Sequence, residues 1–369
     1  MTDRIGGESR LFFSSKRYGF PLVVIALAAG LTVMGNQNLV SATFNSKFMQ
    51  LPAHQVNWSL IGFAAAFITF FLFSKLRLER FWPLYLVIIF ASLAAVLRYG
   101  EEINSSSRWF ETPLGSIQPS ELSKPLMVIV LSALFDRLRP GFFFMAIPAG
   151  ITLGTALLIF LEPDFGTVFI FLFLFFVLYW MNEEDRGRLF RLVLAGGLLG
   201  SLLWFFGLRD YQKARIIAFL YPEKAPDTYY HTQQSITMVG SGGLHGKGFM
   251  QGPGNIYGYI PADHTDFVLA VFAEERGFLG LCFFIGIWAI LLLAILLEAR
   301  RKVGFARNCL LGVFSIFFFQ TFFNVAMVLG LAPVTGVPLP FFTYGGSSML
   351  ANSILIGLTL YAWNKGETR

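Results

Sequence analysis

Long apolar runs separated by short polar segments fill almost the whole chain. A membrane-spanning helix needs about 20 mostly apolar residues, because each residue adds about 1.5 Å along the axis and the hydrocarbon core is about 30 Å thick. The pattern therefore predicts an all-α polytopic integral membrane protein with about ten transmembrane helices in a single domain, residues 1–369. The runs that qualify, within a few residues, are 18–35, 56–73, 81–98, 121–136, 141–161, 165–181, 189–207, 267–297, 305–330 and 349–364.

Two of these runs depart from a simple span. The fourth is short and begins with a polar face. The eighth is long and carries Glu274, Glu275 and Arg276 near its start, which predicts a tilted or broken helix. Between the seventh and eighth runs, residues 208–266 form a long loop without strong secondary-structure patterning, except that 211–221 resemble an amphipathic helix lying on the membrane surface.

The composition agrees with a lipid environment. Apolar residues make up 55% of the chain and charged residues only 14%, whereas soluble domains have about 25% charged residues. The mean hydropathy is +0.63. The net charge of +6 does not indicate nucleic-acid binding, since the basic residues lie in short loops between apolar runs. Cys282 and Cys309 fit neither a disulfide framework nor a metal site.

The distribution of basic residues predicts the orientation of the helices. Cytoplasmic loops carry an excess of Lys and Arg. The loops assigned to the cytoplasm hold 18 basic residues and the alternate segments hold 8, five of them in 208–266, where charge counts weigh little. We therefore expect both termini, 1–17 and 365–369, in the cytoplasm and 99–120, 208–266 and 331–348 on the other side. No small-residue cleavage site is evident, so the first helix is expected to be retained.

Charged residues at membrane depth are costly unless they are paired or hydrated, so they are candidates for a site. Glu121 and Lys124 are three residues apart and share one face of the fourth helix. They either line a polar cavity or form a structural ion pair, and both can be true. Asp164, between the fifth and sixth helices, either caps the sixth helix or takes part directly in a site.

Asp266 ends the long outer loop and starts the eighth helix, at the boundary between lipid and water. A carboxylate there can meet the head group of a lipid-linked substrate while the lipid tail stays in the bilayer. Partial burial would raise its pKa and suit it to act as a general base. The alternative is an N-cap that interacts favourably with the helix dipole.

Two glycine-containing segments are also candidates. The segment 240–248 contains five glycines and Lys247, which fits either a phosphate-cradling loop or a plain turn; it lacks the spacing of a nucleotide-binding P-loop. The segment 338–348 contains two prolines and two glycines next to the last helix. Non-helical backbone at membrane depth is tolerated only when it is buried in protein or lines a hydrated cavity, so this segment indicates a central polar cavity.

Taken together, these segments resemble the SEDS family (shape, elongation, division and sporulation), most closely its RodA-like branch. The resemblance follows the chain in order, and one departure is Glu162, where a Gln is usual. The matching residues are Arg108 and Trp109; Gln118 to Glu121 with Lys124; Pro163 and Asp164 with Gly166 and Thr167; Asp210 to Gln212 with Arg215; Tyr230 and His231 with Gln234 and Ser235; the 240–248 loop; Pro261 with His264 to Phe267, Glu274 and Glu275; Asn324 with Met327; and Thr335 to Pro340 with Tyr344 to Ser347.

The resemblance implies a peptidoglycan glycosyltransferase of the bacterial inner membrane. Its substrate would be lipid II, a disaccharide-pentapeptide on undecaprenyl pyrophosphate, polymerised on the extracytoplasmic side during cell elongation and rod-shape maintenance. Its partner would be a class B penicillin-binding protein that crosslinks the new strand. The family's essential Asp maps onto Asp266 and its buried ion pair onto Glu121 and Lys124. No cofactor is implied with certainty, although a divalent cation, Mg²⁺ or Mn²⁺, would fit the chemistry.

The candidate site therefore has one catalytic residue, Asp266, and a set of residues expected to bind substrate or line the cavity. Two other readings of the same features stay open: a flippase that transports lipid II, and a non-catalytic scaffold for the penicillin-binding protein. The substrate or cavity set is Glu121, Lys124, Arg108, Trp109, Asp164, Arg215, Gln234, Ser235, Lys247, His264, Thr265 and Ser347.

Overall fold

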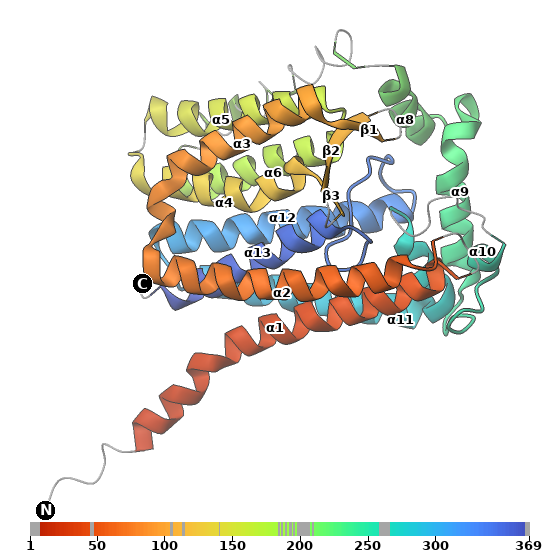
Figure 1. The fold of residues 1–369 in the computed structure, drawn as a ribbon, viewed down its shortest axis with the longest axis horizontal. Helices are drawn as coiled ribbons and strands as arrows, with labels where there is room; N and C mark the ends of the chain where they lie inside the picture. The colour runs from red at the N-terminus through yellow and green to blue at the C-terminus, as the bar shows by residue number, and fades with distance from the viewer. Residues whose placement is uncertain are drawn as a thin grey trace, which may run out of the picture.

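A computed structural model of the chain shows a bundle of long helices (Figure 1). It describes residues 8–365 except 45–47, 104–105, 113–114, 140, 184, 186, 189, 192–193, 195, 198–206, 209 and 258–265. The long helices are α1 (Glu8–Ala42), α2 (Leu51–Leu76), α3 (Trp82–Tyr99), α4 (Pro119–Arg137), α5 (Phe142–Leu161), α6 (Phe165–Asn182), α11 (Val268–Ala299), α12 (Gly304–Val328) and α13 (Gly346–Asn364).

The long helices run roughly parallel or antiparallel to one another, and the two ends of the bundle differ (Figure 1). Helix α1 begins and α13 ends at the same end. The short elements gather toward the opposite end. These short elements are β1 (Glu101–Ile103), β2 (Ser106–Thr112), β3 (Gly115–Ile117), α8 (Asp210–Leu220), α9 (Pro226–Ser241) and α10 (Pro253–Ile256), with the 3₁₀ turn η2 (Pro222–Lys224). A second 3₁₀ turn, η1 (Leu78–Phe81), joins α2 to α3 at the end where α13 finishes.

Among the described residues, seven helices are long and apolar enough to cross a membrane. The predicted polytopic helical fold is therefore confirmed in its class. Most residues of the seventh predicted run, 189–207, lie outside the described part of the chain. Helices α4 and α13 form as predicted and are mostly buried, but they are not among these seven.

Helix α4 is the centre of the bundle, in contact with α3, α5, α6, α12 and α13. From Pro119 to Phe135 all but two of its residues are buried. The proline at its first position suits a helix start, because proline lacks the N–H that would have no partner there. A helix that is enclosed on every side can carry charged residues, provided that neighbouring helices supply their partners.

Two parts of the fold differ from the sequence prediction. The segment 99–120 contains a small antiparallel sheet with the strand order β1-β2-β3, so the fold is not purely helical. The segment 208–266, expected to lack strong secondary structure, is largely helical in its described part, with α8, α9 and α10. Helix α8 covers nearly the predicted amphipathic stretch. A period-based reading missed α9 because its polar residues give no continuous apolar face.

Helix α11 is broken at Gly277, as predicted for the eighth run. Gly277 has φ 67° and ψ −169°, and a Cβ atom there would lie 2.2 Å from the Gly246 nitrogen. The backbone groups freed by the break pair with the 240–248 loop: Phe278 N–H donates to Gly243 O (2.8 Å), and Lys247 N–H donates to Glu274 O (3.1 Å). The loop thus replaces the hydrogen bonds that a continuous helix would have made.

Candidate active site

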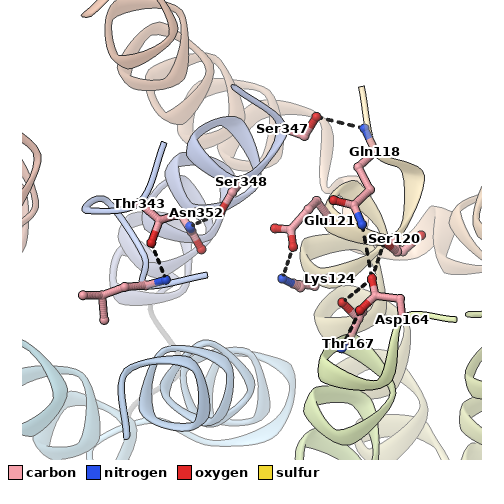
Figure 2. Close-up of polar contacts among 12 residues, drawn as sticks. Gln118, Ser120, Glu121, Lys124, Asp164, Thr167, Thr343, Ser347, Ser348 and Asn352 are labelled. Carbon is pink, nitrogen blue, oxygen red and sulfur yellow. Dashed lines mark hydrogen bonds and ion pairs between the residues drawn. The ribbon is translucent and has the colours of Figure 1, made fainter. Parts of the chain in front are cut away.

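A hydrogen-bonded cluster joins the first turn of α4 to the first turn of α6 (Figure 2). Asp164 Oδ1 accepts from the Thr167 N–H (3.2 Å), which makes Asp164 the N-cap of α6. Its Oδ2 accepts from Thr167 Oγ1 (3.0 Å), Ser120 Oγ (3.0 Å) and Gln118 Nε2 (3.2 Å). One carboxylate therefore caps a helix and fixes the start of α4, so the cap interpretation is confirmed while direct involvement in a site stays a prediction.

Glu121 and Lys124 form a buried ion pair on α4. Lys124 Nζ lies 2.6 Å from Glu121 Oε1, and the side chains are 0% and 5% exposed respectively. Glu121 Oε2 is buried and has no hydrogen-bond partner among the described residues. In Figure 2 both side chains point from α4 toward the side where Ser348 and Asn352 lie on α13. The pair is thus a structural ion pair with one acceptor still available.

Arg108, on β2, lies over the turn between α5 and α6. Its Nη2 donates to the Pro163 carbonyl oxygen, and its Nε is buried without a partner among the described residues. This contact holds the small sheet against the Asp164 turn. Trp109, the next residue on β2, is half-buried and pairs with Glu101 of β1. The sheet, which no sequence pattern predicted, is what brings Arg108 to the outer end of α4.

Glu162 lies in the same turn and is only 1% exposed. Neither of its carboxylate oxygens has a hydrogen-bond partner among the described residues. Burial, together with the neighbouring Asp164 carboxylate, raises the pKa of Glu162 to about 8, against an opposing effect of Arg108. At neutral pH Glu162 is therefore mostly protonated. The turn then carries one carboxylate, Asp164, beside the Arg108 guanidinium.

The segment 331–345 connects this cluster to Asp266. It is not helical, and Val337, Leu339, Phe341 and Phe342 are buried, so the predicted non-helical backbone is enclosed in protein. At its end, Ser347 Oγ accepts from the Gln118 N–H (2.9 Å) and donates to Ser116 O (3.3 Å). The last helix is thereby tied to the β3–α4 junction.

Near the start of the same segment, Gly166 packs against Thr335 and Val337, close enough that a Cβ atom on Gly166 would lie 2.8 Å from Val337 Cγ2. The segment therefore touches the α6 turn that holds Asp164.

Asp266 lies on the other side of this segment and is half-buried. A Cβ atom on Gly336 would lie 3.5 Å from Asp266 Oδ2, and Gly336 has φ 72°, a conformation that favours glycine. Asn324 Nδ2 donates to both Asp266 O (3.1 Å) and Val337 O (2.9 Å). Asn324 thus fixes the backbone of the aspartate relative to the segment. The residue before α11 is Phe267, so Asp266 is not the N-cap of that helix.

Two other predicted residues make contacts away from the Asp164 cluster. Ser235 is fully buried and donates to Val328 O (2.8 Å), which docks α9 on α12. Lys247 Nζ pairs with Glu274 Oε1 (3.0 Å) and donates to Ser241 Oγ (2.7 Å). The backbone N–H groups of the 240–248 loop also donate to α11. The loop therefore holds the broken helix in place, and its donors are not open to bind a phosphate.

Four predicted site residues remain. Arg215 Nη1 donates to Val334 O (3.2 Å), so α8 also contacts the 331–345 segment. Gln234 is half-buried on α9. His264 and Thr265 lie outside the described residues.

The sequence leaves open a divalent cation, Mg²⁺ or Mn²⁺, at the candidate site. Within the described part of the chain, no group of three or more His, Cys, Asp or Glu side chains could hold a metal ion. Asp164 and Glu162 lie two residues apart, but Arg108 is directed at the same turn and would repel a cation. These residues do not fit a metal, and no step of a mechanism is derived through one.

Sequence reasoning did not single out two buried polar residues of this region. They are Glu162, which the sequence marks only as a departure from the family resemblance, and Asn352 of α13, which is not among the predicted site residues. Asn352 is fully buried, donates from Nδ2 to Ser348 Oγ (3.2 Å) and leaves its Oδ1 without a partner among the described residues. The available signal was a strongly polar residue within or beside an apolar run, which is costly in a membrane and marks a site.

Comparisons with known proteins place this arrangement among characterised relatives. Residues 18–366 match the FTSW_RODA_SPOVE family of cell cycle proteins. The chain is 33% identical over 290 residues to the peptidoglycan glycosyltransferase MrdB of Escherichia coli K12, covering 77% of this chain and 78% of that protein. It is 35% identical over 315 residues to MrdB of Helicobacter pylori, covering 81% and 79%.

Solved structures give the same picture. One from a study of a peptidoglycan synthase complex that coordinates polymerization and crosslinking superposes with a TM-score of 0.79 at 30% identity, covering 92% of this chain and 96% of that one. The rod shape determining protein RodA of Thermus thermophilus superposes with a TM-score of 0.67 at 29% identity, covering 93% and 95%.

Proposed function

The chain belongs to the FTSW_RODA_SPOVE family of cell cycle proteins, and from this premise we propose that it is a peptidoglycan glycosyltransferase. It polymerises lipid II into glycan strands during cell elongation and rod-shape maintenance. The observation that carries this function is the family match along nearly the whole chain, together with relatives named as peptidoglycan glycosyltransferases at 33–35% identity.

The chain is a multi-pass membrane protein, and the proposal extends to its topology. With ten spans, both termini lie in the cytoplasm. The β1–β3 sheet, α8, α9 and α10 then lie on the extracytoplasmic side. Two observations support this: the excess of basic residues in alternate loops, and the gathering of the short elements toward the end of the bundle opposite the start of α1 and the end of α13 (Figure 1).

Asp266 is the proposed general base. Its carboxylate takes the proton from the 4-hydroxyl of the acceptor sugar while that oxygen attacks the anomeric carbon of the donor strand. The bond from this carbon to undecaprenyl pyrophosphate breaks, and the pyrophosphate leaves with the bonding electrons. The half-burial of Asp266 beside Gly336 and the fixing of its backbone by Asn324 support a positioned base.

Arg108 is the proposed cation for the leaving pyrophosphate. A developing negative charge is stabilised most by donors that are already fixed in place and shielded from water. Arg108 is anchored through Nη2 on Pro163 O and keeps a buried Nε without a partner among the described residues. Lys124 and Lys247 are weaker candidates for stabilising the leaving pyrophosphate, since each is paired with a glutamate.

The Glu121–Lys124 pair and Asp164 are proposed to hold α4, α6 and α13 in the arrangement that the site requires. The unpaired Glu121 Oε2 and Asn352 Oδ1 offer acceptors for sugar or peptide hydrogen-bond donors. A class B penicillin-binding protein is the proposed partner, because one of the similar structures belongs to a study of a complex that couples polymerization with crosslinking.

The test is a polymerisation assay with purified protein, lipid II and the variant Asp266→Asn. General-base catalysis contributes roughly 10²- to 10⁴-fold, so we expect strand synthesis to fall by at least about 100-fold. The matched control is Asp227→Asn, which makes the same change at an exposed position on α9 and should leave the rate unchanged. An unaffected rate in Asp266→Asn would remove this residue from the role of base.

The same assay separates the two rival functions. A flippase would move labelled lipid II between leaflets of reconstituted vesicles and make no strands. A scaffold would make no strands and tolerate replacement of both Asp266 and Glu121 in cells.

A further inference from the structure

A polar cavity lies at the opposite end of the bundle, away from the candidate active site. Its volume is about 550 Å³, and it lies where α2 and α4 end, η1 follows α2, and α13 ends. All charged residues that line it belong to these ends. They are Arg77, Arg80, Arg137, Lys365, Glu79 and Asp136.

The charges around this cavity favour an anion. Four cationic side chains face two carboxylates, so the lining carries a net charge of about +2 at neutral pH. One of the cations is already paired, since Lys365 Nζ lies 3.3 Å from Glu79 Oε1. The end of the chain that carries Lys365 is held by Lys302, whose Nζ donates to Trp363 O (2.5 Å) and Lys365 O (2.9 Å). The cavity wall is therefore built by contacts within the protein.

Glu79 adds a second requirement to the ligand. It is 8% exposed; Lys365 pairs with its Oε1, the Tyr361 hydroxyl lies beside its carboxylate, and its Oε2 is buried with no donor at hydrogen-bonding geometry among the described residues. A buried acceptor without a donor is costly, so a ligand that brings a donor is favoured. The ligand that fits both features carries a phosphate for the arginines and a hydroxyl group for Glu79.

The position of the cavity adds a third requirement. The large apolar side chains beside it are exposed, among them Leu76 (57%) and Phe81 (52%). They lie next to the basic residues at the ends of membrane-spanning helices. A ligand there meets water and cations with its polar end and lipid-facing side chains with its apolar end, which is the position of a phospholipid at the bilayer surface.

We propose that this cavity binds the head group of an anionic phospholipid with a free hydroxyl group, of the phosphatidylglycerol type. The phosphate lies among Arg77, Arg80 and Arg137, and the glycerol hydroxyl donates to Glu79 Oε2. The acyl chains lie against Leu76 and Phe81. A bound lipid then joins the ends of α2, α4 and α13 and stabilises the bundle around α4.

The experiment is native mass spectrometry of the purified full chain after exchange into mixed phosphatidylglycerol and phosphatidylcholine. We expect the wild-type protein to retain phosphatidylglycerol in preference to phosphatidylcholine. The double variant Arg80→Gln/Arg137→Gln should retain roughly ten- to thirty-fold less phosphatidylglycerol. The control Arg300→Gln/Arg301→Gln removes the same charge from exposed residues at the same end, outside the cavity, and should retain as much as the wild type.

Other outcomes overturn the proposal. Equal losses in the two double variants would mean that the lipid responds only to diffuse surface charge. Displacement of the lipid by millimolar inorganic phosphate would mean a site for a soluble anion. A second variant, Glu79→Gln, tests the hydroxyl contact. It should reduce the preference for phosphatidylglycerol over phosphatidic acid, and a stronger preference would show that Glu79 only repels the head group.

Discussion

At the scale of single residues, the candidate site is governed by the cost of charge in a place with little water. Lys124, Glu121, Asp164 and Glu162 are all almost completely buried. Each meets the cost in its own way: Lys124 and Glu121 pair, Asp164 accepts hydrogen bonds from four donors, and Glu162 keeps its proton. The protonation of Glu162 gives the site a dependence on pH that a Gln at this position would not have.

Glu162 predicts how stability changes with pH. Its pKa in the folded protein, about 8, lies above the ordinary glutamate value of 4.5, so between these values the folded protein holds a proton that the unfolded chain has lost. Unfolding releases this proton, and the contribution to stability is therefore lost as the pH rises from about 4.5 to about 8. The variant Glu162→Gln should melt at the same temperature as the wild type near pH 5.

At pH 9, by contrast, Glu162→Gln should melt at least about 3 °C higher than the wild type. The measurement is a thermal melt in detergent at both pH values. Glu111→Gln, an exposed position on β2, is the control and should follow the wild type at both. Parallel pH profiles for the wild type and Glu162→Gln would contradict a raised pKa.

The ion pair predicts strong coupling between its partners. Removing one partner of a buried pair leaves an unpaired charge, which costs about 3–5 kcal/mol. We expect Glu121→Gln and Lys124→Met each to lower the melting temperature strongly, and the double variant to recover most of the loss. The exposed pair of Arg191 and Asp185 (3.9 Å) is the comparison, where the coupling should be below about 1 kcal/mol. Additive effects at Glu121 and Lys124 would mean that they do not act as a pair.

At the scale of elements, the break in α11 decides where the outer surface begins. The part of α11 from Phe278 to Ala299 has about the length that a membrane requires, roughly 30 Å. The part before Gly277 turns away from that axis and carries Glu274 and Glu275. Both glutamates have partners outside α11: Lys247 for Glu274, and Ser41 with the Met250 N–H for Glu275. The break therefore makes room for polar residues at the surface without exposing them to lipid.

The break depends on glycine at one position, which gives a matched pair of variants. Gly277→Ala would place a Cβ atom 2.2 Å from Gly246 N in a backbone conformation that alanine avoids, so we expect a loss of more than about 2 kcal/mol and a lower yield of folded protein. Gly286→Ala lies in the same helix with open space around it and should be neutral or stabilise by up to about 1 kcal/mol. Equal melting temperatures for the two variants would show that the break tolerates a side chain.

At the scale of the whole molecule, the two ends of the bundle are chemically different. The candidate active site lies toward the end where α8, α9 and the small sheet gather (Figure 1). The basic cavity lies at the other end, where α2, α4 and α13 end. An enzyme that takes a lipid-linked substrate from one leaflet needs this asymmetry. A transporter needs polar access from both sides, and here the two polar regions are separated by the apolar core of the bundle.

The proposed topology predicts which end reacts with a membrane-impermeant maleimide in intact spheroplasts. In a background without native thiols (Cys282→Ala, Cys309→Ala), Asp227→Cys should be labelled at once. Arg300→Cys should be labelled only after the membrane is permeabilised. Labelling of Arg300→Cys in intact spheroplasts, or protection of Asp227→Cys, would reverse the proposed orientation.

The membrane class, most of the spans, the broken eighth helix and the non-helical segment before the last helix could all be predicted from the sequence. These features follow from local properties: the length of apolar runs, and glycine, proline or charge within them. The tertiary structure alone decided which polar groups meet. Asn38 donates to Val268 O (2.7 Å) although 230 positions separate them, and Asn324 joins Asp266 to Val337.

The same holds for the proton on Glu162 and the cavity at the other end of the bundle. Both depend on how much water neighbouring helices exclude and which charges they bring together. Apolar periodicity shows that a helix is buried but not which helix covers it, because lipid-facing and core-facing side chains are both mostly apolar in a membrane protein. Only the packing of the helices shows which side chains lie close to one another.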